Sequence, residues 1–194
     1  MKIILASKSP RRIEMMNELF GSFEIKEANV SEFVSSYNSS EDLVMQLSMK
    51  KAECIFNDNK DALVLGFDTL VFCDNEIMGK PQNEEECINM ISKLSNHNHI
   101  VVTGVTMIAN DYKESFYSKC LVHFTTIPLE DIVKYSKTKE PYDKAGGYAI
   151  QGYIGRYIDK IEGDYFTVVG FPKALVYSKV MNYLKGRKWL NIYY

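Results

Sequence analysis

Apolar residues recur along this chain in two patterns, short continuous runs and stripes with helical spacing. Residues 3–6 form the first run and predict a buried strand, and residues 10–20 carry a stripe that predicts a helix. Ser9 suits the N-cap of this helix, and Pro10 suits its first position, where a missing backbone N–H costs nothing. The chain therefore begins with a strand, a tight turn and a helix.

Strands and helices alternate through the rest of the sequence. Further helices are expected from about residues 39, 83, 128 and 172, and strands at 62–72, 99–109 and 115–125. The helix near residue 128 is expected to bury Leu129, Ile132 and Val133. Residues 140–172 are rich in glycine and proline and are expected to mix short strands with loops. This order of elements predicts an α/β fold with a mixed β-sheet.

Composition and charge narrow the class of protein. The 194 residues suit one domain or two closely joined lobes, with 46% hydrophobic and 25% charged residues. The formal net charge of −2 lacks the basic excess of a protein that grips polymeric nucleic acid, so no such partner is expected. Without an apolar run of roughly 18 residues or a signal-peptide core, we expect a cytoplasmic protein with no membrane partner.

The cysteine pattern gives no metal-binding or redox motif. The four cysteines are far apart and include no C-x-x-C pair, which argues against a zinc knuckle and a thioredoxin-like motif; they are Cys54, Cys73, Cys87 and Cys120. Each lies in an apolar stretch, where free cysteines are usually buried. We expect four buried free thiols in a reducing compartment.

The segment between the first strand and the first helix predicts an anion site. A helix N-terminus favours an anion through its dipole and its backbone N–H groups, and the hydroxyls of Ser7 and Ser9 add donors. Arg11 and Arg12 lie in the first turn, where the dipole repels cations, so a strong anion such as a polyphosphate would account for them. The alternative is two solvated arginines, one of them bridging to Glu14.

Asp68 is the strongest candidate for a catalytic or metal-binding group. It follows the apolar residues 63–67, and a carboxylate there is costly to bury unless it is hydrogen-bonded or bound to a metal. Mg²⁺ on a polyphosphate uses one or two carboxylates, and an aspartate can also orient or deprotonate a water. The alternative is an aspartate that caps a turn at the end of a strand. Glu32 is a second, weaker candidate carboxylate.

Two lysines and a glycine-rich segment add further candidates. Lys51 falls on the apolar stripe of the second helix, where its side chain either extends outward to water or enters a site. Lys80 lies between Gly79 and Pro81 and could neutralise phosphate charge. In the glycine-rich residues 143–152, Gln151 offers both a donor and an acceptor that could read the edge of a base. The alternative is a turn with a structural glutamine.

Taken together and in this order, these segments resemble the Maf family. The matching segments are residues 4–12, 66–69, 79–81, 94–95, 99–103, 144–152 and 169–172, and the resemblance covers about residues 3–184. It implies a two-lobed α/β fold like that of Maf and inosine triphosphatases, with an elongated, curved mixed β-sheet flanked by helices and a central cleft. The whole chain, residues 1–194, would form a single Maf-like domain whose two lobes surround one active-site cleft.

The resemblance also implies a reaction and its residues. Members of this family are house-cleaning nucleoside triphosphate pyrophosphatases that use a divalent cation, Mg²⁺ or Mn²⁺, and often form homodimers. The catalytic aspartate of the family corresponds to Asp68, which would also bind the metal together with Glu32. The phosphate-binding positions match Ser9, Arg12, Lys51 and Lys80, and Ser7 is expected to contact substrate beside them.

Three further positions bear on the substrate. The dTTP and UTP pyrophosphatases of the family have arginine, threonine and glutamine where this chain has Arg11, Thr69 and Gln151. The resemblance therefore implies hydrolysis of dTTP and UTP, and of modified pyrimidine triphosphates, to the monophosphate and pyrophosphate. Two alternatives are a 7-methyl-GTP pyrophosphatase and a non-catalytic nucleotide-binding regulator linked to cell division.

The chain departs from the family pattern at three positions. Phe67 stands where a small residue is usual, Phe171 where leucine is usual, and Asn96 where glycine is usual. Phe67 adjoins Asp68 and could reshape the pocket, which bears on fine substrate preference and not on the reaction class. The aromatic tail at residues 189–194 is assigned no role.

Overall fold

The computed structural model describes residues 1–74 and 76–186, so the aromatic tail lies outside the described residues. The strands are β1 (Lys2–Leu5), β2 (Glu24–Ile25), β3 (Ala62–Cys73), β4 (Glu76–Met78), β5 (Asn98–Ala109), β6 (Tyr112–Phe124) and β7 (Ile158–Gly163). The helices are α1 (Pro10–Phe20), α2 (Ser40–Phe56), α3 (Glu84–Leu94), α4 (Leu129–Ser136), α5 (Tyr165–Val169) and α6 (Lys173–Lys185). Among the described residues, no helix is long and apolar enough to cross a bilayer.

The strands form a seven-stranded mixed sheet in the order β2-β1-β3-β5-β6-β7, with β4 paired to β3 off this path. β1 runs parallel to both β2 and β3, with Ile4 opposite Val64 in β3. These parallel pairs need crossover connections, which α1 and α2 supply. β4 and β7 are antiparallel to β3 and β6 respectively. The predicted α/β class with a mixed sheet is confirmed.

The expected starts of the helices agree closely with the structure. Ser39 and Asn83 are the N-caps of α2 and α3, and each side chain accepts a hydrogen bond from the backbone N–H three residues on. Pro172 directly precedes α6. The glycine-rich residues 140–172 contain one strand, β7, and otherwise form α5 and three short 3₁₀ helices instead of several strands.

The chain forms two compact units. Of the described residues, unit 1 comprises residues 1–68, 104–117 and 170–186, and unit 2 comprises residues 69–103 and 118–169. β3, β5 and β6 each contribute residues to both units. Each unit has its own buried core.

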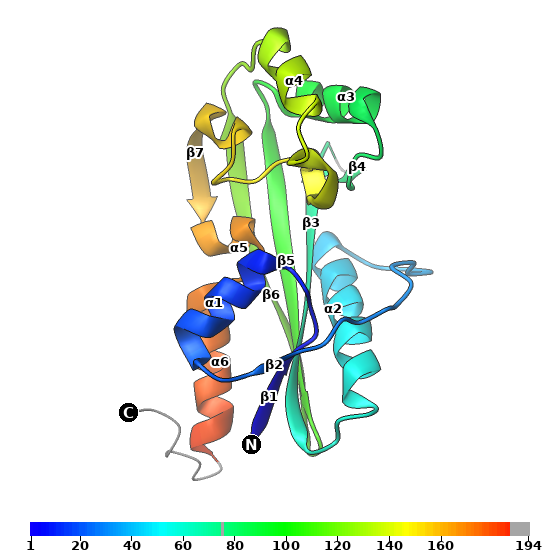
Figure 1. Ribbon diagram of the computed structural model, residues 1–194, viewed down its shortest axis with the longest axis vertical. Coiled ribbons are helices and arrows are strands. Elements are labelled where there is room, and N and C mark those ends of the chain that lie inside the picture. The colour runs from blue at the N-terminus through cyan, green and yellow to red at the C-terminus, as the bar shows by residue number, and fades with distance from the viewer. Residues whose placement is uncertain (75, 187–194) are drawn as a thin grey trace. The chain divides into compact units, whose positions relative to one another are not determined.

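In unit 1, helix α2 packs on one face of the sheet, and α1 and α6 lie side by side on the other (Figure 1). Two glycines allow α2 to come close: a Cβ on Gly66 would lie 2.3 Å from the carbonyl oxygen of Ser48, and one on Gly104 would lie 2.4 Å from that of Val44. On the opposite side, the rings of Phe20 in α1 and Tyr177 in α6 stack with centroids 6.4 Å apart. The core beneath α2 includes Ile4, Ala52, Ile55, Val64 and Ile108.

Unit 2 buries its own apolar cluster, over which α3 and α4 pack against each other (Figure 1). The cluster includes Val71, Cys87, Ile91, Leu94, Phe124, Ile132, Tyr135 and Ile154. The prediction that Leu129 is buried is wrong, because it is 63% exposed. α4 begins at this residue. Ile132 is buried as predicted, Val133 is half-buried, and Tyr135 completes the buried face of the helix.

All four cysteines are free thiols, as predicted. Cys73, Cys87 and Cys120 are buried, and all three lie in the core of unit 2. Cys54 is only half-buried, so its predicted burial is wrong. It lies at the edge of the buried face of α2, whose centre is taken by Ser48, Ala52 and Ile55.

Candidate functional site

Asp68 lies at the end of the buried part of β3 that belongs to unit 1. Alternate residues of a strand share a face, so Asp68 lies on the same face as Gly66, against which α2 packs. Lys51 lies on that face of α2, between Ser48 and Ala52, and its ammonium group contacts Oδ1 of Asp68. The close approach allowed by Gly66 therefore brings a lysine of the second helix to the aspartate.

A second carboxylate shares the same ammonium group. Nζ of Lys51 lies 2.9 Å from Oε1 of Glu32, which belongs to the loop before α2. Asp68 is 5% exposed, whereas Glu32 is largely in solvent. Two carboxylates thus converge on one cationic group, one of them buried and the other accessible. Such a pair of oxygen donors suits a hard divalent cation as well as an ammonium group.

Several neighbouring groups act in opposite directions on the pKa of Asp68. Burial raises the pKa of this carboxyl, because the ionised form loses its hydration. The charges of Lys51 and Arg12 act in the opposite direction, and the carboxylate of Glu32 raises the pKa further. The pKa of Asp68 remains above its ordinary value, which is the direction that suits a group that accepts a proton near neutral pH.

Arg12 is held in place by three acceptors of unit 1. Its Nε donates to the carbonyl of Gly170 at 3.0 Å, and its Nη1 donates to the carbonyl of Phe67 at 3.2 Å and to the hydroxyl of Ser7 at 3.3 Å. Burial lowers the pKa of Arg12 to about 10, so the guanidinium stays charged at neutral pH. A fixed, partly desolvated guanidinium beside a helix N-terminus is a favourable partner for a phosphate.

Phe67 supports this arginine from the face of β3 opposite Asp68. The guanidinium carbon of Arg12 lies 5.5 Å from the centroid of the Phe67 ring. Phe67 in turn stacks on Phe171, with centroids 4.8 Å apart and the ring planes inclined by 19°. Both rings are fully buried. Two of the three departures from the family pattern are therefore in contact with each other.

The start of α1 differs from the prediction in one respect. Ser9 is at the N-cap position, but its side chain makes no capping hydrogen bond, and its own N–H donates to Oγ of Ser7 at 3.2 Å. The first turn of α1 also holds no acidic residue. The hydroxyl of Ser9 therefore does not neutralise the positive end of the helix dipole, which remains available to an anion.

The structure brings together the predicted residues of unit 1 and places three others in unit 2. Unit 1 holds Ser7, Ser9, Arg11, Arg12, Glu32, Lys51 and Asp68. In unit 2, Oγ1 of Thr69 lies 3.0 Å from Oγ1 of Thr103. Lys80 and Gln151 are both exposed, Lys80 in the loop after β4 and Gln151 in a turn between two 3₁₀ helices.

One residue near Gln151 was missed by the sequence analysis. Glu140 accepts hydrogen bonds from the backbone N–H of Tyr153 at 3.2 Å and from the hydroxyl of Tyr135 at 3.3 Å. A Cβ on Gly152 would lie 1.7 Å from Oε1 of Glu140, so a larger residue would displace this carboxylate from its position. The glutamate thereby fixes the turn that carries Gln151. The only sequence signal was Gly152 itself, which does not identify the residue it contacts.

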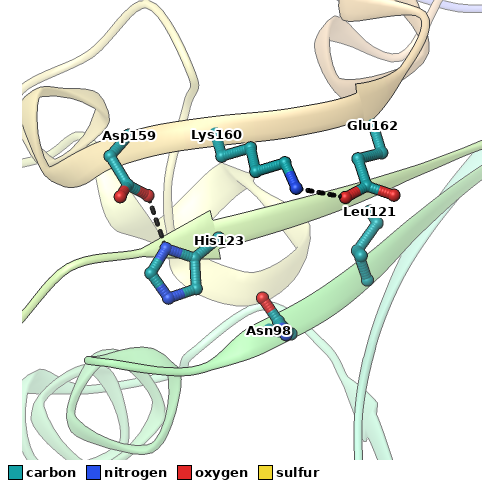
Figure 2. Close-up of a pocket in the computed structure, with 6 residues that line it drawn as sticks. All are labelled: Asn98, Leu121, His123, Asp159, Lys160 and Glu162. Carbon is teal, nitrogen blue, oxygen red and sulfur yellow. Dashed lines mark hydrogen bonds and ion pairs between the residues drawn. The ribbon is translucent and has the colours of Figure 1, made fainter.

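A pocket of about 290 Å³ lies elsewhere in unit 2 (Figure 2). It is lined by Asn98, Leu121, His123, Asp159, Lys160 and Glu162. Its charged side chains are paired with each other, His123 with Asp159 and Lys160 with Glu162. None of the predicted site residues lines it, so it is separate from the candidate site.

Comparison with known proteins gives a family and several relatives. A family described as Maf-like protein matches residues 2–183. The dTTP/UTP pyrophosphatase of Bacillus cereus strain ATCC 14579 is 44% identical over 173 residues, which is 89% of this chain and 91% of that protein. The dTTP/UTP pyrophosphatase of Bacillus thuringiensis subsp. konkukian strain 97-27 is 44% identical over 171 residues, covering 88% and 90% of the two chains.

Two solved structures share the fold at low sequence identity. The Ham1 protein of Staphylococcus aureus has a TM-score of 0.52 and 13% identity, covering 94% of this chain and 100% of that chain. A HAM1 protein from Coxiella burnetii has a TM-score of 0.51 and 12% identity, covering 96% and 99%. The resemblance in fold supports the predicted fold class.

Proposed function

Because this chain belongs to the Maf-like protein family, we propose that it hydrolyses dTTP and UTP to the monophosphate and pyrophosphate. The observation that carries the proposal is the buried carboxylate of Asp68, held between Lys51 and Arg12 beside the start of α1. The relatives that are 44% identical over most of the chain, named dTTP/UTP pyrophosphatases, support the choice of reaction and substrate.

The triphosphate is proposed to bind at the start of α1. The helix dipole and the hydroxyls of Ser7 and Ser9 favour the anion there, and Arg12 provides a guanidinium whose position is already fixed. Lys51 adds a second cation on the α2 side. Lys80 is proposed to neutralise further phosphate charge. Positive groups at these places would stabilise the charge that develops on the leaving pyrophosphate.

Asp68 is proposed to orient and deprotonate the water that attacks the α-phosphorus. The bond from water oxygen to phosphorus forms, the bond from phosphorus to the bridging oxygen breaks, and the proton of the water passes to the Asp68 carboxylate. Its raised pKa supports this role, because a carboxylate accepts a proton more readily when burial raises its pKa.

Asp68 and Glu32 are also the residues proposed to hold a divalent cation, Mg²⁺ or Mn²⁺. The fit rests on their oxygen atoms, which converge on one ammonium group and so form a place that attracts positive charge. When bound, the cation would neutralise phosphate oxygens and polarise the α-phosphorus.

The pyrimidine base is proposed to be read by Arg11, Thr69 and Gln151. Gln151 lies in a turn that Glu140 fixes, which would hold the backbone of Gln151 in a constant position. Modified pyrimidine triphosphates are proposed as further substrates. A homodimer, a cytoplasmic location and the cleft between two lobes stay predictions.

One assay tests the proposal against its alternatives. The purified protein is incubated with Mg²⁺ and, separately, dTTP, UTP, dCTP, GTP and 7-methyl-GTP, and released pyrophosphate is measured, with Asp68→Asn as the blank. We expect release from dTTP and UTP above all others, and near-background release by the variant. Preference for 7-methyl-GTP would replace the substrate assignment, and no release from any triphosphate would favour a nucleotide-binding regulator.

A further inference from the structure

Three side chains of unit 2 with different metal-binding groups lie close together, and none of them belongs to the phosphate site. Cys73 ends β3, Asp74 follows it in the turn to β4, and His97 immediately precedes β5. The sulfur of Cys73, a carboxylate oxygen of Asp74 and a ring nitrogen of His97 all lie within 4.8 Å of one another. The cluster therefore places a thiol, a carboxylate and an imidazole near enough to one another to bind the same ion.

The distances within the cluster suit a tetrahedral metal. Nε2 of His97 lies 3.0 Å from Oδ1 of Asp74, and Sγ of Cys73 lies 3.8 Å from Oδ2 of the same residue. Ligand atoms about 2.0–2.3 Å from a tetrahedral zinc are roughly 3.3–3.6 Å from each other. The observed distances run to different oxygens of the Asp74 carboxylate and lie on either side of this range, so binding an ion through one of these oxygens requires side-chain rotation.

Backbone hydrogen bonds fix the positions from which these side chains extend. Cys73 is paired with Glu76 across the β3–β4 hairpin, and Asp74 has a positive φ of 50° in the turn. On the other side, the carbonyl of His97 accepts a hydrogen bond from the N–H of Phe124 at 3.1 Å. The two segments are therefore held near each other before any ion binds, which lowers the cost of ordering the ligands.

Charge also favours a divalent ion. Glu76 lies beside the cluster and is paired with Lys93 at 2.6 Å, so these two charges cancel. Once a metal has displaced the proton of the Cys73 thiol to solvent, the thiolate and the carboxylate of Asp74 carry two negative charges, which match a divalent cation. Cys73 is buried while Asp74 and His97 are exposed, with side chains 58% and 45% accessible, so a bound ion could reach solvent.

We propose that Cys73, Asp74 and His97 bind a thiophilic divalent transition metal such as Zn²⁺, with a fourth position left to water. Thiolate and imidazole ligands select zinc or cobalt, whereas Mg²⁺ prefers oxygen ligands, so this ion differs from the one proposed at Asp68. The ion would join the β3–β4 turn to the segment before β5. Because it binds only the folded protein, it would raise the unfolding temperature.

The test uses the full chain, stripped of metal by a chelator and titrated with Co²⁺. We expect one equivalent to bind and to produce the near-ultraviolet charge-transfer band of a cobalt–thiolate bond. Cys73→Ser should abolish the band, and His97→Gln, at an exposed position that does not threaten folding, should weaken binding at least about tenfold. Zn²⁺ should raise the unfolding temperature of the unaltered chain and not that of His97→Gln.

Matched controls separate this site from others. Cys87→Ser changes another buried thiol of unit 2, and His123→Gln changes another histidine paired with an aspartate; both should leave the titration unchanged. Asp68→Asn should also leave it unchanged, and excess Mg²⁺ should not displace Co²⁺, so the outcome is independent of the proposed hydrolysis. The proposal is wrong if no thiolate band forms, or if the band survives in Cys73→Ser.

Discussion

Asp68 shows how strongly a single buried carboxylate depends on its partners. Its charge is surrounded by protein and balanced by Lys51, which contacts it directly, and by Arg12. Removing Lys51 leaves the Asp68 carboxylate in the interior without its contacting cation, whereas neutralising Asp68 leaves Lys51 still paired with Glu32 and Arg12 still bonded to its three acceptors. The two single substitutions therefore have different consequences for stability.

We expect Lys51→Met to lower the free energy of unfolding by about 2–3 kcal/mol, less than a fully buried pair would lose because Arg12 remains. Asp68→Asn should change the free energy of unfolding by less than about 1 kcal/mol. The same substitution should lower the turnover rate by a factor on the order of 10²–10³. Urea unfolding and pyrophosphate release measure the two effects. Equal losses of stability in the two variants would contradict the buried ion pair.

His99 is a second buried titratable residue, and it has no charged partner. It is 1% exposed, its Nε2 lies 2.6 Å from the hydroxyl of Tyr148, and its Nδ1 has no hydrogen-bond partner. Burial lowers its pKa to about 3. The folded protein therefore keeps this imidazole neutral at pH values where the unfolded chain protonates it.

Acid should destabilise the protein through His99. Between its ordinary pKa of 6.5 and about 3, the unfolded state binds one more proton, so stability falls by up to about 1.4 kcal/mol per pH unit as the pH drops. Above pH 6.5 the residue contributes no pH dependence. Urea unfolding from pH 7.5 to 4.5 should give a shallower decline in His99→Gln than in the unaltered chain. His123→Gln, which changes a half-buried histidine of the same unit, is the control and should retain the steeper slope.

At the scale of single residues, the sequence identified the charged groups of the site better than their contacts. Asp68 and Lys51 stood out because a charge next to an apolar run, or on an apolar face, is physically unusual, and Arg12 stood out because a cation in the first turn of a helix opposes the helix dipole. The carbonyl of Gly170, which accepts from Arg12, could not be found in this way, because any residue offers a carbonyl. The absence of a capping hydrogen bond from the Ser9 side chain could not be predicted either. The sequence does not reveal that the N–H of Ser9 donates to the hydroxyl of Ser7.

At the scale of elements, the close packing of α2 on the sheet determines where Lys51 lies. This packing depends on the absence of side chains at Gly66 and Gly104, since backbone atoms of α2 occupy the space that a Cβ would need. Helix starts and strand ranges were predictable because caps, prolines and periodic apolar positions are local signals. The distance between a helix and a sheet depends on residues far apart in the chain. The sequence patterns therefore did not predict that Gly66 and Gly104 determine how closely α2 packs.

Gly66→Ala tests the dependence of the site on this packing. The new methyl carbon would lie 2.3 Å from the carbonyl oxygen of Ser48, and a helix backbone cannot rotate away as a side chain can, so α2 must move. We expect a loss of about 1–3 kcal/mol in the free energy of unfolding and a larger proportional loss of turnover, because Lys51 moves from Asp68. Gly186→Ala, where the nearest atom would be 3.6 Å away, is the control. Normal turnover in the Gly66 variant would show that the site tolerates displacement of α2.

At the scale of the whole molecule, the sequence predicted the class of fold but not the strand order. Crossover helices imply parallel pairing for β1 with its neighbours, yet nothing in their sequences indicates that β3 lies between β1 and β5. Strand order is set by contacts between residues far apart in the chain, which single-sequence patterns do not record. The family resemblance, carried by several motifs in a fixed order, implied a mixed sheet flanked by helices but gave no strand order.

Substrate binding should stabilise the folded chain as a whole. A ligand that binds only the native state adds about 2.7 kcal/mol at a hundredfold excess over its Kd. Asp68→Asn, which should bind without turnover, allows dTTP itself to be used in a thermal unfolding assay with Mg²⁺. We expect a rise in unfolding temperature with dTTP and UTP, and a much smaller rise in a variant that also carries Arg12→Ala. An equal rise with and without Arg12 would place the triphosphate elsewhere.

The stacking of Phe67 on Phe171 has a consequence for how these two positions vary during evolution. They fill one shared space beneath Arg12, so replacing either ring alone by a smaller side chain opens a void that the other cannot fill. Substitutions at the two positions should therefore be inherited together. Across homologues, an aromatic residue at one position should accompany an aromatic residue at the other, and single-ring intermediates should be rare.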